Sequence, residues 1–360
     1  MTNIKGSYRR NGKYIYIKQP EYDDLAFVSK LWSDKETMKD IGGVFDFPKS
    51  KWEMFYKKMV YPTDGKNFYC LVYTINDEAI GEVSFHGYDL VTKIARFNIK
   101  IHHKYRNKGY GKEALRLLLE YFFLDFGGGM IIDSIPTESA MRIAKDLGFK
   151  EIGQYKDGVK VKITSDDFFK KEKNVTKNIG ILMYDGMSML DYATAFDTLK
   201  MVNLIEEKEL FKINSISFKN KVKLNNGLVI DTEIIDIENF KPDILIIPDG
   251  MIGMNKEIKN MILENFNSYD YICTKGEGIK FLNDCKVLDG IKVPKFPYEI
   301  YDFCEKDRIE EKNLIDGGKI ILSGNILGSF EMIISLVQKV AGREVSNKLK
   351  KYLGHNKLKL

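Results

Sequence analysis

The stretch KIARFNIKIHHKYRNKGYGKEALRLLLEYFFLDF, residues 93–126, decides the fold of the N-terminal half of the chain. Residues 93–101 alternate apolar and polar side chains, which predicts a strand, and residues 112–126 place apolar side chains at helical spacing. A basic loop with two glycines, residues 102–111, lies between them. Because the first backbone N–H groups of a helix have no partners inside the helix, this order predicts an anion-binding site.

The loop itself carries the features that a phosphate requires. Gly109 and Gly111 let the backbone approach a ligand without an intervening side chain, and Arg106, Lys108 and Lys112 add positive charge. On spacing alone, the pattern RxxGxG is a moderate signal, and a solvated basic loop that caps a helix is the alternative.

Two further runs upstream alternate apolar and polar residues in the same way. They are NFYCLVYT, residues 67–74, and EAIGEVSFHGY, residues 78–88, with a turn between them. Together with residues 93–101 they predict consecutive antiparallel strands.

These features resemble the GNAT family of acetyl-CoA-dependent N-acetyltransferases, because RNKGYG (residues 106–111) matches the RxxGxG pyrophosphate loop of that family. LWSDKETMKDIGG (residues 31–43) is similar to the early helical segment of ribosomal-protein-alanine-type acetyltransferases. SAMRIAKDLGFKEIG (residues 139–153) is similar to their closing helix and the start of the next strand. The resemblance covers about residues 9–168 and implies a mixed, mostly antiparallel sheet with helices.

The resemblance also implies where acetyl-CoA, the co-substrate, would bind. The backbone of the loop would cradle the pyrophosphate, and the strand end around Ile101 would run beside the pantetheine arm. The residues expected at the cofactor are Ile101, Arg106, Asn107, Lys108, Gly109, Tyr110, Gly111 and Lys112. Thr137 stands where the family often has Asn, and Ala144 where many members have a Tyr that acts as general acid. We therefore expect cofactor binding to be retained without the usual acid, and we expect no metal.

Acetyl transfer to an amine needs positioning of two reactants and a base for the ammonium proton. Glu82, in the run IGEVSF, is the candidate base, acting directly or through water, and His86 is the reserve. Each has a structural alternative, because Glu82 could face solvent on a strand and His86 could belong to a turn.

The chain divides at a sharp change of composition. DDFFKKEKNVTKN, residues 166–178, is polar and rich in lysine, and it is followed by NIGILMY, a short apolar run typical of a buried strand. We place a first domain at residues 1–169, a linker at 170–177 and a second domain at 178–360. A chain of 360 residues is too long for one average domain, which favours this division.

The second half alternates strand-like and helix-like runs. Strands are expected over residues 178–184, 212–218, 243–250, 270–275 and 319–324, and helices over 195–206 and 329–342. This alternation predicts a parallel sheet with helices on both faces and a site at the carboxyl ends of the strands. The whole chain is thus expected to be a two-domain α/β protein.

The second half resembles the ThiJ/PfpI superfamily, a flavodoxin-like parallel α/β sandwich related to class I glutamine amidotransferases. YDGMSMLDYATAFDTL (residues 184–199) is similar to the first loop and helix of that superfamily, and IIPDGM (residues 246–251) stands where it has a VPGG-type oxyanion loop. KVLDG (residues 286–290) and residues 322–346 match later segments. The resemblance covers about residues 178–355 and allows a homodimer through this domain.

Two registers remain open at the nucleophile of that superfamily. One places it on Cys273, with Asp191 as the nearby acid, and needs three extra residues in the following helix. The other has no gap, places Gly276 at the nucleophile position and puts Phe296 where a His is usual. Glycine tolerates the strained backbone of such a turn, so the turn could persist without the nucleophile. Asp191 would then brace or cap its own helix.

Composition excludes several other classes. The net charge of +5 is spread over mixed lysines and acids, so we expect no nucleic-acid partner. Cys70, Cys273, Cys285 and Cys304 lack CxxC spacing, which argues against a disulfide framework or a zinc site. No apolar run approaches the length of a membrane span, and the N-terminus lacks a signal-peptide pattern, so a cytoplasmic location is expected.

The combined interpretation is an acetyl-CoA-dependent N-acetyltransferase acting on a primary amine, on a small molecule or a peptide N-terminus. The C-terminal ThiJ/PfpI-like domain would bind a ligand or support dimerisation without catalysis. Two alternatives stay open. One is a Cys273-dependent hydrolase or hydratase with an accessory acetyltransferase domain, and the other is a non-catalytic CoA-responsive binding protein.

Overall fold

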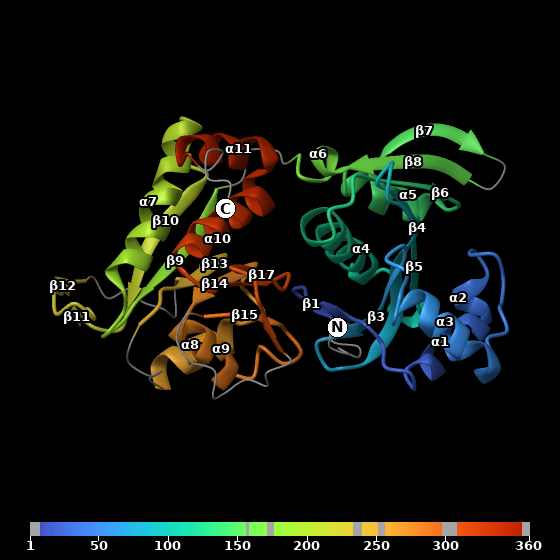
Figure 1. The fold of residues 1–360 in the computed structure, drawn as a ribbon, viewed down its shortest axis with the longest axis horizontal. Coiled ribbons are helices and arrows are strands. Elements are labelled where there is room, and N and C mark those ends of the chain that lie inside the picture. The colour runs from blue at the N-terminus through green and yellow to red at the C-terminus, as the bar shows by residue number, and fades with distance from the viewer. Residues whose placement is uncertain are drawn as a thin grey trace. The chain divides into compact units, whose positions relative to one another are not determined.

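The computed structural model describes residues 8–155, 158–170, 176–232, 240–250, 256–296 and 308–354. Contacts divide the chain into two compact units, Met1–Phe168 and Phe169–Leu360, and each is described by itself (Figure 1). The predicted linker, residues 170–177, falls partly on residues 171–175, which lie outside the described ranges. So does Cys304.

The N-terminal unit is built on an eight-stranded sheet in the order β1-β2-β3-β4-β5-β6-β8-β7. Its strands are β1 (Arg9–Asn11), β2 (Ile15–Lys18), β3 (Phe68–Thr74), β4 (Ala79–Asp89), β5 (Ile94–Ile101), β6 (Met130–Ile135), β7 (Lys150–Tyr155) and β8 (Gly158–Thr164). All neighbouring strands are antiparallel except β5 and β6. The predicted mixed, mostly antiparallel sheet is confirmed.

Helices cover both faces of this sheet. They are α1 (Leu25–Ser33), α2 (Lys35–Met38), α3 (Trp52–Met59), α4 (Tyr110–Glu120), α5 (Glu138–Asp146) and α6 (Ser165–Phe168). Side chains alternate along β3, so Tyr69 and Leu71 pack with α1 and α3 while Phe68 faces the other side. There Phe68 stacks on Tyr121, directly after α4, with ring centroids 4.1 Å apart. Helix α4 therefore lies on the face opposite α1 and α3.

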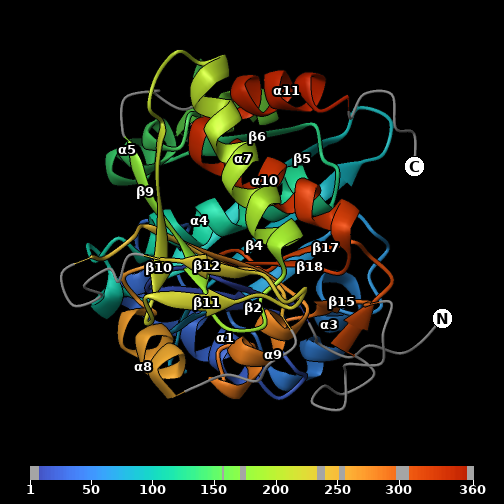
Figure 2. The same cartoon turned by 90° about the vertical axis from the view of Figure 1, so that its left-hand side faces the viewer.

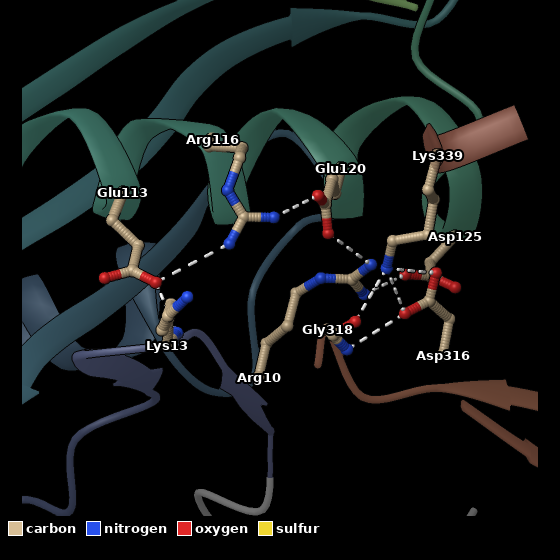
Figure 3. A network of polar contacts seen from close by, with 9 residues as sticks. All are labelled: Arg10, Lys13, Glu113, Arg116, Glu120, Asp125, Asp316, Gly318 and Lys339. Carbon is tan, nitrogen blue, oxygen red and sulfur yellow. Dashed lines mark hydrogen bonds and ion pairs between the residues drawn. The ribbon is translucent and has the colours of Figure 1, made fainter. Parts of the chain in front are cut away.

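Ion pairs fix α4 beside the first strand. Figure 3 shows the guanidinium of Arg10, which is fully buried, between Glu120 at 3.2 Å and Asp125 at 2.8 Å. About two turns before Glu120 on the same helix, the carboxylate of Glu113 accepts the backbone N–H of Lys13. Breaking a buried pair of this kind leaves an uncompensated charge, so the position of α4 is strongly determined.

The C-terminal unit contains a six-stranded sheet in the order β10-β9-β13-β14-β18-β17. Its strands are β9 (Lys177–Met183), β10 (Phe211–Ser217), β13 (Ile244–Ile247), β14 (Tyr271–Lys275), β17 (Leu314–Asp316) and β18 (Ile320–Ser323). All neighbouring pairs are parallel except β17 with β18. Four short strands form two small sheets: β11 (Lys221–Lys223) with β12 (Val229–Asp231), and β15 (Val293–Pro294) with β16 (Ile309–Glu310).

Helices lie on both sides of the parallel sheet, as the alternating sequence predicted (Figure 2). They are α7 (Met189–Ile205), α8 (Lys256–Asn265), α9 (Glu277–Asp284), α10 (Ile326–Ala341) and α11 (Arg343–Tyr352). One apolar cluster joins the sheet to α8 and α9, and another joins it to α7, α10 and α11. The predicted parallel α/β sandwich is confirmed.

A buried lysine secures the antiparallel edge of this sheet. Lys339 of α10 pairs with Asp316 of β17 at 2.8 Å and donates to the carbonyl of Gly318 at 2.8 Å (Figure 3). Both charged side chains are almost fully buried, so each depends on the other for its solvation.

Over the described ranges, no helix has the length and apolarity of a membrane span.

Candidate functional site

The N-terminal sheet opens between β5 and β6. These parallel strands pair only through Ile94 with Met130 and Ala95 with Ile131. Farther along, the carboxylate of Asp133 accepts the backbone N–H of Phe97 at 3.0 Å. A side chain there takes the place of a strand partner, and the two strands separate.

The opening leads to a cleft of about 1520 Å³, lined by residues of β4, β5, β6, α4 and α5. Ligand sites commonly measure about 300 to 1,000 Å³, so the space is sufficient for a large cofactor together with a second substrate. The cleft lies wholly within the N-terminal unit.

The start of α4 forms one end of the cleft. Gly109 precedes the helix with φ +83°, a left-handed conformation that favours glycine. The first backbone N–H to bond back into the helix is that of Glu113, which donates to the Gly109 carbonyl at 3.1 Å. The N–H groups of Tyr110, Gly111 and Lys112 precede this bond, so they are available to an anion at the helix N-terminus.

Most of the residues predicted at the cofactor line this cleft. They are Ile101, Arg106, Asn107, Gly109, Gly111 and Lys112. Of the residues predicted at the cofactor, Lys108 and Tyr110 do not line it. The ammonium of Lys108 lies over the Tyr105 ring, 5.4 Å from its centroid. A Cβ atom at Gly111 would make only ordinary contact with Ile101, at 3.6 Å, so the protein's own packing does not demand glycine there.

The guanidinium of Arg106 is used to hold the loop. It donates to the carbonyl of Ile101 at 3.2 Å and to the carbonyl of Thr37 at 2.5 Å, and it lies 3.7 Å from Asp40. Arg106 thus ties the end of β5 to helix α2. The sequence pattern predicted a positive charge at this place, but it did not predict these backbone partners.

Glu82 lies on β4 with its carboxylate fully buried, and it accepts hydrogen bonds from four side chains. Trp32 Nε1 and Asn98 Nδ2 each donate at 2.9 Å, and the Tyr69 hydroxyl and the Lys100 ammonium each donate at 2.5 Å. Burial, and then the charge of Glu82, raise the pKa of Tyr69 well above its usual value, so the phenol stays protonated. Glu82 therefore does not face solvent, and it is held in one orientation.

Sequence reasoning missed the four donors around Glu82. Two of them had a detectable signal, because strand alternation places Asn98 and Lys100 on one face of β5 and the register pairs Lys100 with Glu82. Trp32 and Tyr69 come from α1 and β3, and only tertiary packing brings them to the carboxylate.

His86 lines the same cleft, four residues farther along β4 than Glu82. Residues four apart on a strand share a face but are separated by about 13 Å, so the two candidates do not form one catalytic pair. Burial lowers the pKa of His86, which favours the neutral imidazole. Of the two positions that depart from the family pattern, Thr137 caps α5 through the Ala140 N–H and Ala144 is buried.

One group of side chains has the composition of a metal site. Asp34, His102 and His103 offer ligand atoms within 4.8 Å of one another, and His103 Nδ1 lies 2.9 Å from Asp34 Oδ1. The expectation of no metal therefore stays a prediction.

In the C-terminal unit, Gly276 occupies the turn between β14 and α9, with φ +55° and ψ −123°. Cys273 lies inside β14, fully buried among the residues that face α7 and α10. Burial raises the pKa of the Cys273 thiol, which disfavours the reactive thiolate. Asp191 pairs with the Lys275 ammonium at 2.7 Å and accepts from the Ser329 hydroxyl at 3.2 Å.

The carboxylate of Asp249 fills the space at this turn. It accepts the backbone N–H of Glu277, at the start of α9, at 2.9 Å and that of Gly250 at 2.8 Å. A Cβ atom on Gly276 would collide with the same carboxylate. A hollow of about 10 Å³, lined by Asp191, Asp249 and Lys275 among others, lies beside it and has about the minimum volume for one water molecule.

Residues 15–150 match the model of the acetyltransferase (GNAT) domain family. An uncharacterized N-acetyltransferase, YnaD of Bacillus subtilis (strain 168), is 29% identical over 149 residues, which cover 40% of this chain and 84% of that protein.

Two solved structures are similar to one half of the chain each. The acetyltransferase (GNAT family) from Bacillus anthracis is 25% identical, with a TM-score of 0.37, and covers 43% of this chain and 98% of its own. Drosophila melanogaster DJ-1beta is 15% identical, with a TM-score of 0.44, and covers 50% of this chain and 98% of its own.

Proposed function

We propose that the chain is an acyltransferase that transfers an acetyl group from acetyl-CoA to an amine, because residues 15–150 match the model of the acetyltransferase (GNAT) domain family. From this premise we propose that the cleft of the N-terminal unit acetylates a primary amine carried by a small molecule or a peptide N-terminus. The observation that carries the proposal is the separation of β5 from β6 directly beside the free N–H groups of α4.

The cofactor would enter this opening in one orientation. The loop from Arg106 to Gly111 would hold the pyrophosphate, with the N–H groups at the start of α4 and the helix dipole binding the anion. Arg106 would act indirectly, because its guanidinium holds the loop through the Ile101 and Thr37 carbonyls. The strand end at Ile101 would lie along the pantetheine arm, and the acetyl group supplied by the cofactor would then reach the middle of the cleft.

Glu82 is the base that the geometry favours. A base must lie within hydrogen-bond reach of the proton that it takes, and the carboxylate of Glu82 borders the cleft in a fixed orientation. It would take the proton from the acceptor ammonium, directly or through water, as the nitrogen attacks the thioester carbonyl. Lys100 competes for this carboxylate, so the acceptor must displace its ammonium or find it neutralised. His86, which lies farther along the strand, is the reserve.

A panel of primary amines tests the proposal, with release of the CoA thiol as the readout. We expect turnover with at least one amine, and we expect Glu82→Gln to lower kcat by at least about 10²-fold, the usual contribution of a general base. Glu53→Gln is the matched control, because Glu53 lies on α3 in an exposed pair with Lys57. Equal rates for Glu82→Gln and the wild type would refute the base, and no thiol release with any amine would refute the activity.

For the C-terminal unit we propose a binding or dimerisation role without catalysis. The positions of Gly276 and Asp249 support it, since the turn that would carry a nucleophile has glycine and the space beside it is filled. The buried thiol of Cys273 does not favour the alternative of a cysteine hydrolase. The homodimer, the cytoplasmic location and the absence of a nucleic-acid partner stay predictions.

A further inference from the structure

We propose that Lys100 is a modification site of the enzyme itself, whose ε-amine accepts the acetyl group from acetyl-CoA bound in the same cleft. This inference rests on the proposed function, because it needs acetyl-CoA in that cleft. It goes beyond that function, because the acceptor is a residue of the chain.

The position of Lys100 is that of an acceptor amine. It is the penultimate residue of β5, the strand whose separation from β6 opens the cleft, and it lies six residues before Arg106. Its side chain lines the cleft and is only 11% exposed. The Nζ atom lies 2.5 Å from Glu82 Oε1 and 5.2 Å from the centroid of the Trp32 ring. The amine is thus already in contact with the carboxylate that we propose as the base.

The chemistry at this position is complete. Glu82 takes a proton from the Lys100 ammonium, and the neutral Nζ attacks the thioester carbonyl. A C–N bond forms, the C–S bond breaks, a second proton leaves the nitrogen, which keeps one as an amide N–H, and the CoA thiolate is released and protonated. Each event converts one lysine and one acetyl-CoA into acetyl-lysine, free CoA and one proton. Holding the amine in the site makes the step unimolecular, so its rate does not depend on the protein concentration.

Two other described lysines of the N-terminal unit lack this combination. Lys112 lines the cleft, but its ammonium pairs with Asp146 and is 47% exposed. Lys57 lies outside the cleft, on α3, and is 63% exposed. Reagent in solution would acetylate such exposed amines first, whereas the enzyme would acetylate Lys100 first. Selectivity for a nearly buried lysine therefore distinguishes catalysis from chemical labelling.

Acetylation of Lys100 would change the state of Glu82. The modification removes the positive charge, so Glu82 loses its ion pair and keeps the neutral donors Trp32, Tyr69 and Asn98. The carboxylate then becomes available to an acceptor ammonium without competition. The modified enzyme should bind an added amine more tightly than the unmodified one.

The test is incubation of the full-length chain with isotopically labelled acetyl-CoA and no added amine, followed by peptide mass spectrometry. We expect label at Lys100 to appear with first-order kinetics that do not depend on protein concentration, at least about 10-fold faster than at Lys57. Glu82→Gln should slow this labelling at least about 10²-fold, the low end of the effect of removing a base. Lys57→Arg is the matched control and should leave labelling of Lys100 unchanged.

Three results would overturn the inference. They are no label at Lys100, labelling no faster than at exposed lysines, or the same relative labelling in protein unfolded by urea. Turnover with an added amine is measured on the same samples, so loss of labelling with retained turnover refutes this inference alone. Lys100→Gln, which mimics the acetylated side chain, should lower the KM for the amine, and an unchanged KM would count against the proposed consequence for Glu82.

Discussion

Gly276→Ala should destabilise the C-terminal unit by about 4 kcal/mol, for two reasons that the structure separates. A residue with a side chain at φ +55° and ψ −123° costs about 1–3 kcal/mol in backbone strain. The new Cβ would also displace the Asp249 carboxylate from the N–H groups of Glu277 and Gly250. Losing hydrogen bonds to a charged group costs about another 1.5–3 kcal/mol.

Urea unfolding of the full-length chain measures this effect, because the two units can be followed separately. The only tryptophans are Trp32 and Trp52, both in the N-terminal unit, so their fluorescence follows that unit while far-UV circular dichroism follows both. With a urea slope of about 2 kcal/mol per M, the midpoint of the C-terminal unit should fall by about 2 M. The fluorescence transition should stay where it is.

Gly227→Ala is the matched control for strain alone. Gly227 also has a positive φ, +87°, but an added Cβ would meet no atom within 4 Å. Its cost should be about 1–2 kcal/mol. Replacing Asp249 by Gly in the Gly276→Ala background should recover the part due to collision, giving a favourable coupling energy of about 1.5 kcal/mol or more in a double-mutant cycle. The reasoning is refuted if Gly276→Ala costs no more than Gly227→Ala, or if the cycle shows no coupling.

Three further outcomes are expected. Cys273 should react with a thiol probe at neutral pH no faster than Cys285, because burial raises the pKa of both thiols and Cys273 is fully buried. Selective labelling of Cys273, measured by mass spectrometry, would contradict this expectation. Arg106→Ala should raise the KM for acetyl-CoA by about 10-fold or more, because the charged hydrogen bonds that it loses are worth at least about 1.5 kcal/mol. Arg106→Lys should recover little of this loss. An unchanged KM would show that the loop does not depend on this guanidinium. Folding lowers the pKa of His86, so the unfolded chain binds the proton more tightly than the folded chain does. The free energy of unfolding should therefore fall as the pH drops through about 6.5. His86→Gln should weaken this pH dependence in unfolding experiments from pH 7.5 to 5.

The sequence predicted the elements of the N-terminal site better than the directions of its side chains. Alternation at residues 93–101, two glycines and helical spacing were enough to predict a strand, a loop and a helix start, because these are local properties. The direction of the Arg106 guanidinium depends on the carbonyls of Thr37 and Ile101. Thr37 is distant in sequence, so no local pattern contained that information.

Glu82 shows a second property that the local sequence did not predict, the burial of its carboxylate. Its place on a strand could be read from the run IGEVSF, and the cross-strand position of Lys100 follows from the register. Burial of the carboxylate could not be read in the same way, because it results from the packing of Trp32 and Tyr69 over the strand. Strand periodicity alone left a strand residue facing solvent as an alternative for Glu82.

A reaction needs polar groups that converge on free space, and this requirement separates the two units. In the N-terminal unit, Glu82 borders a cleft of about 1520 Å³ that can admit both substrates. In the C-terminal unit, the groups at the carboxyl ends of the strands converge on each other: Asp191 on Lys275, and Asp249 on the N–H of Glu277. That N–H begins a helix and would otherwise be free to bind an anion, so the Asp249 carboxylate occupies the position that a reaction intermediate would need. We therefore infer that acetyl transfer takes place in the cleft of the first unit, because the described groups at the strand ends of the second unit bind each other.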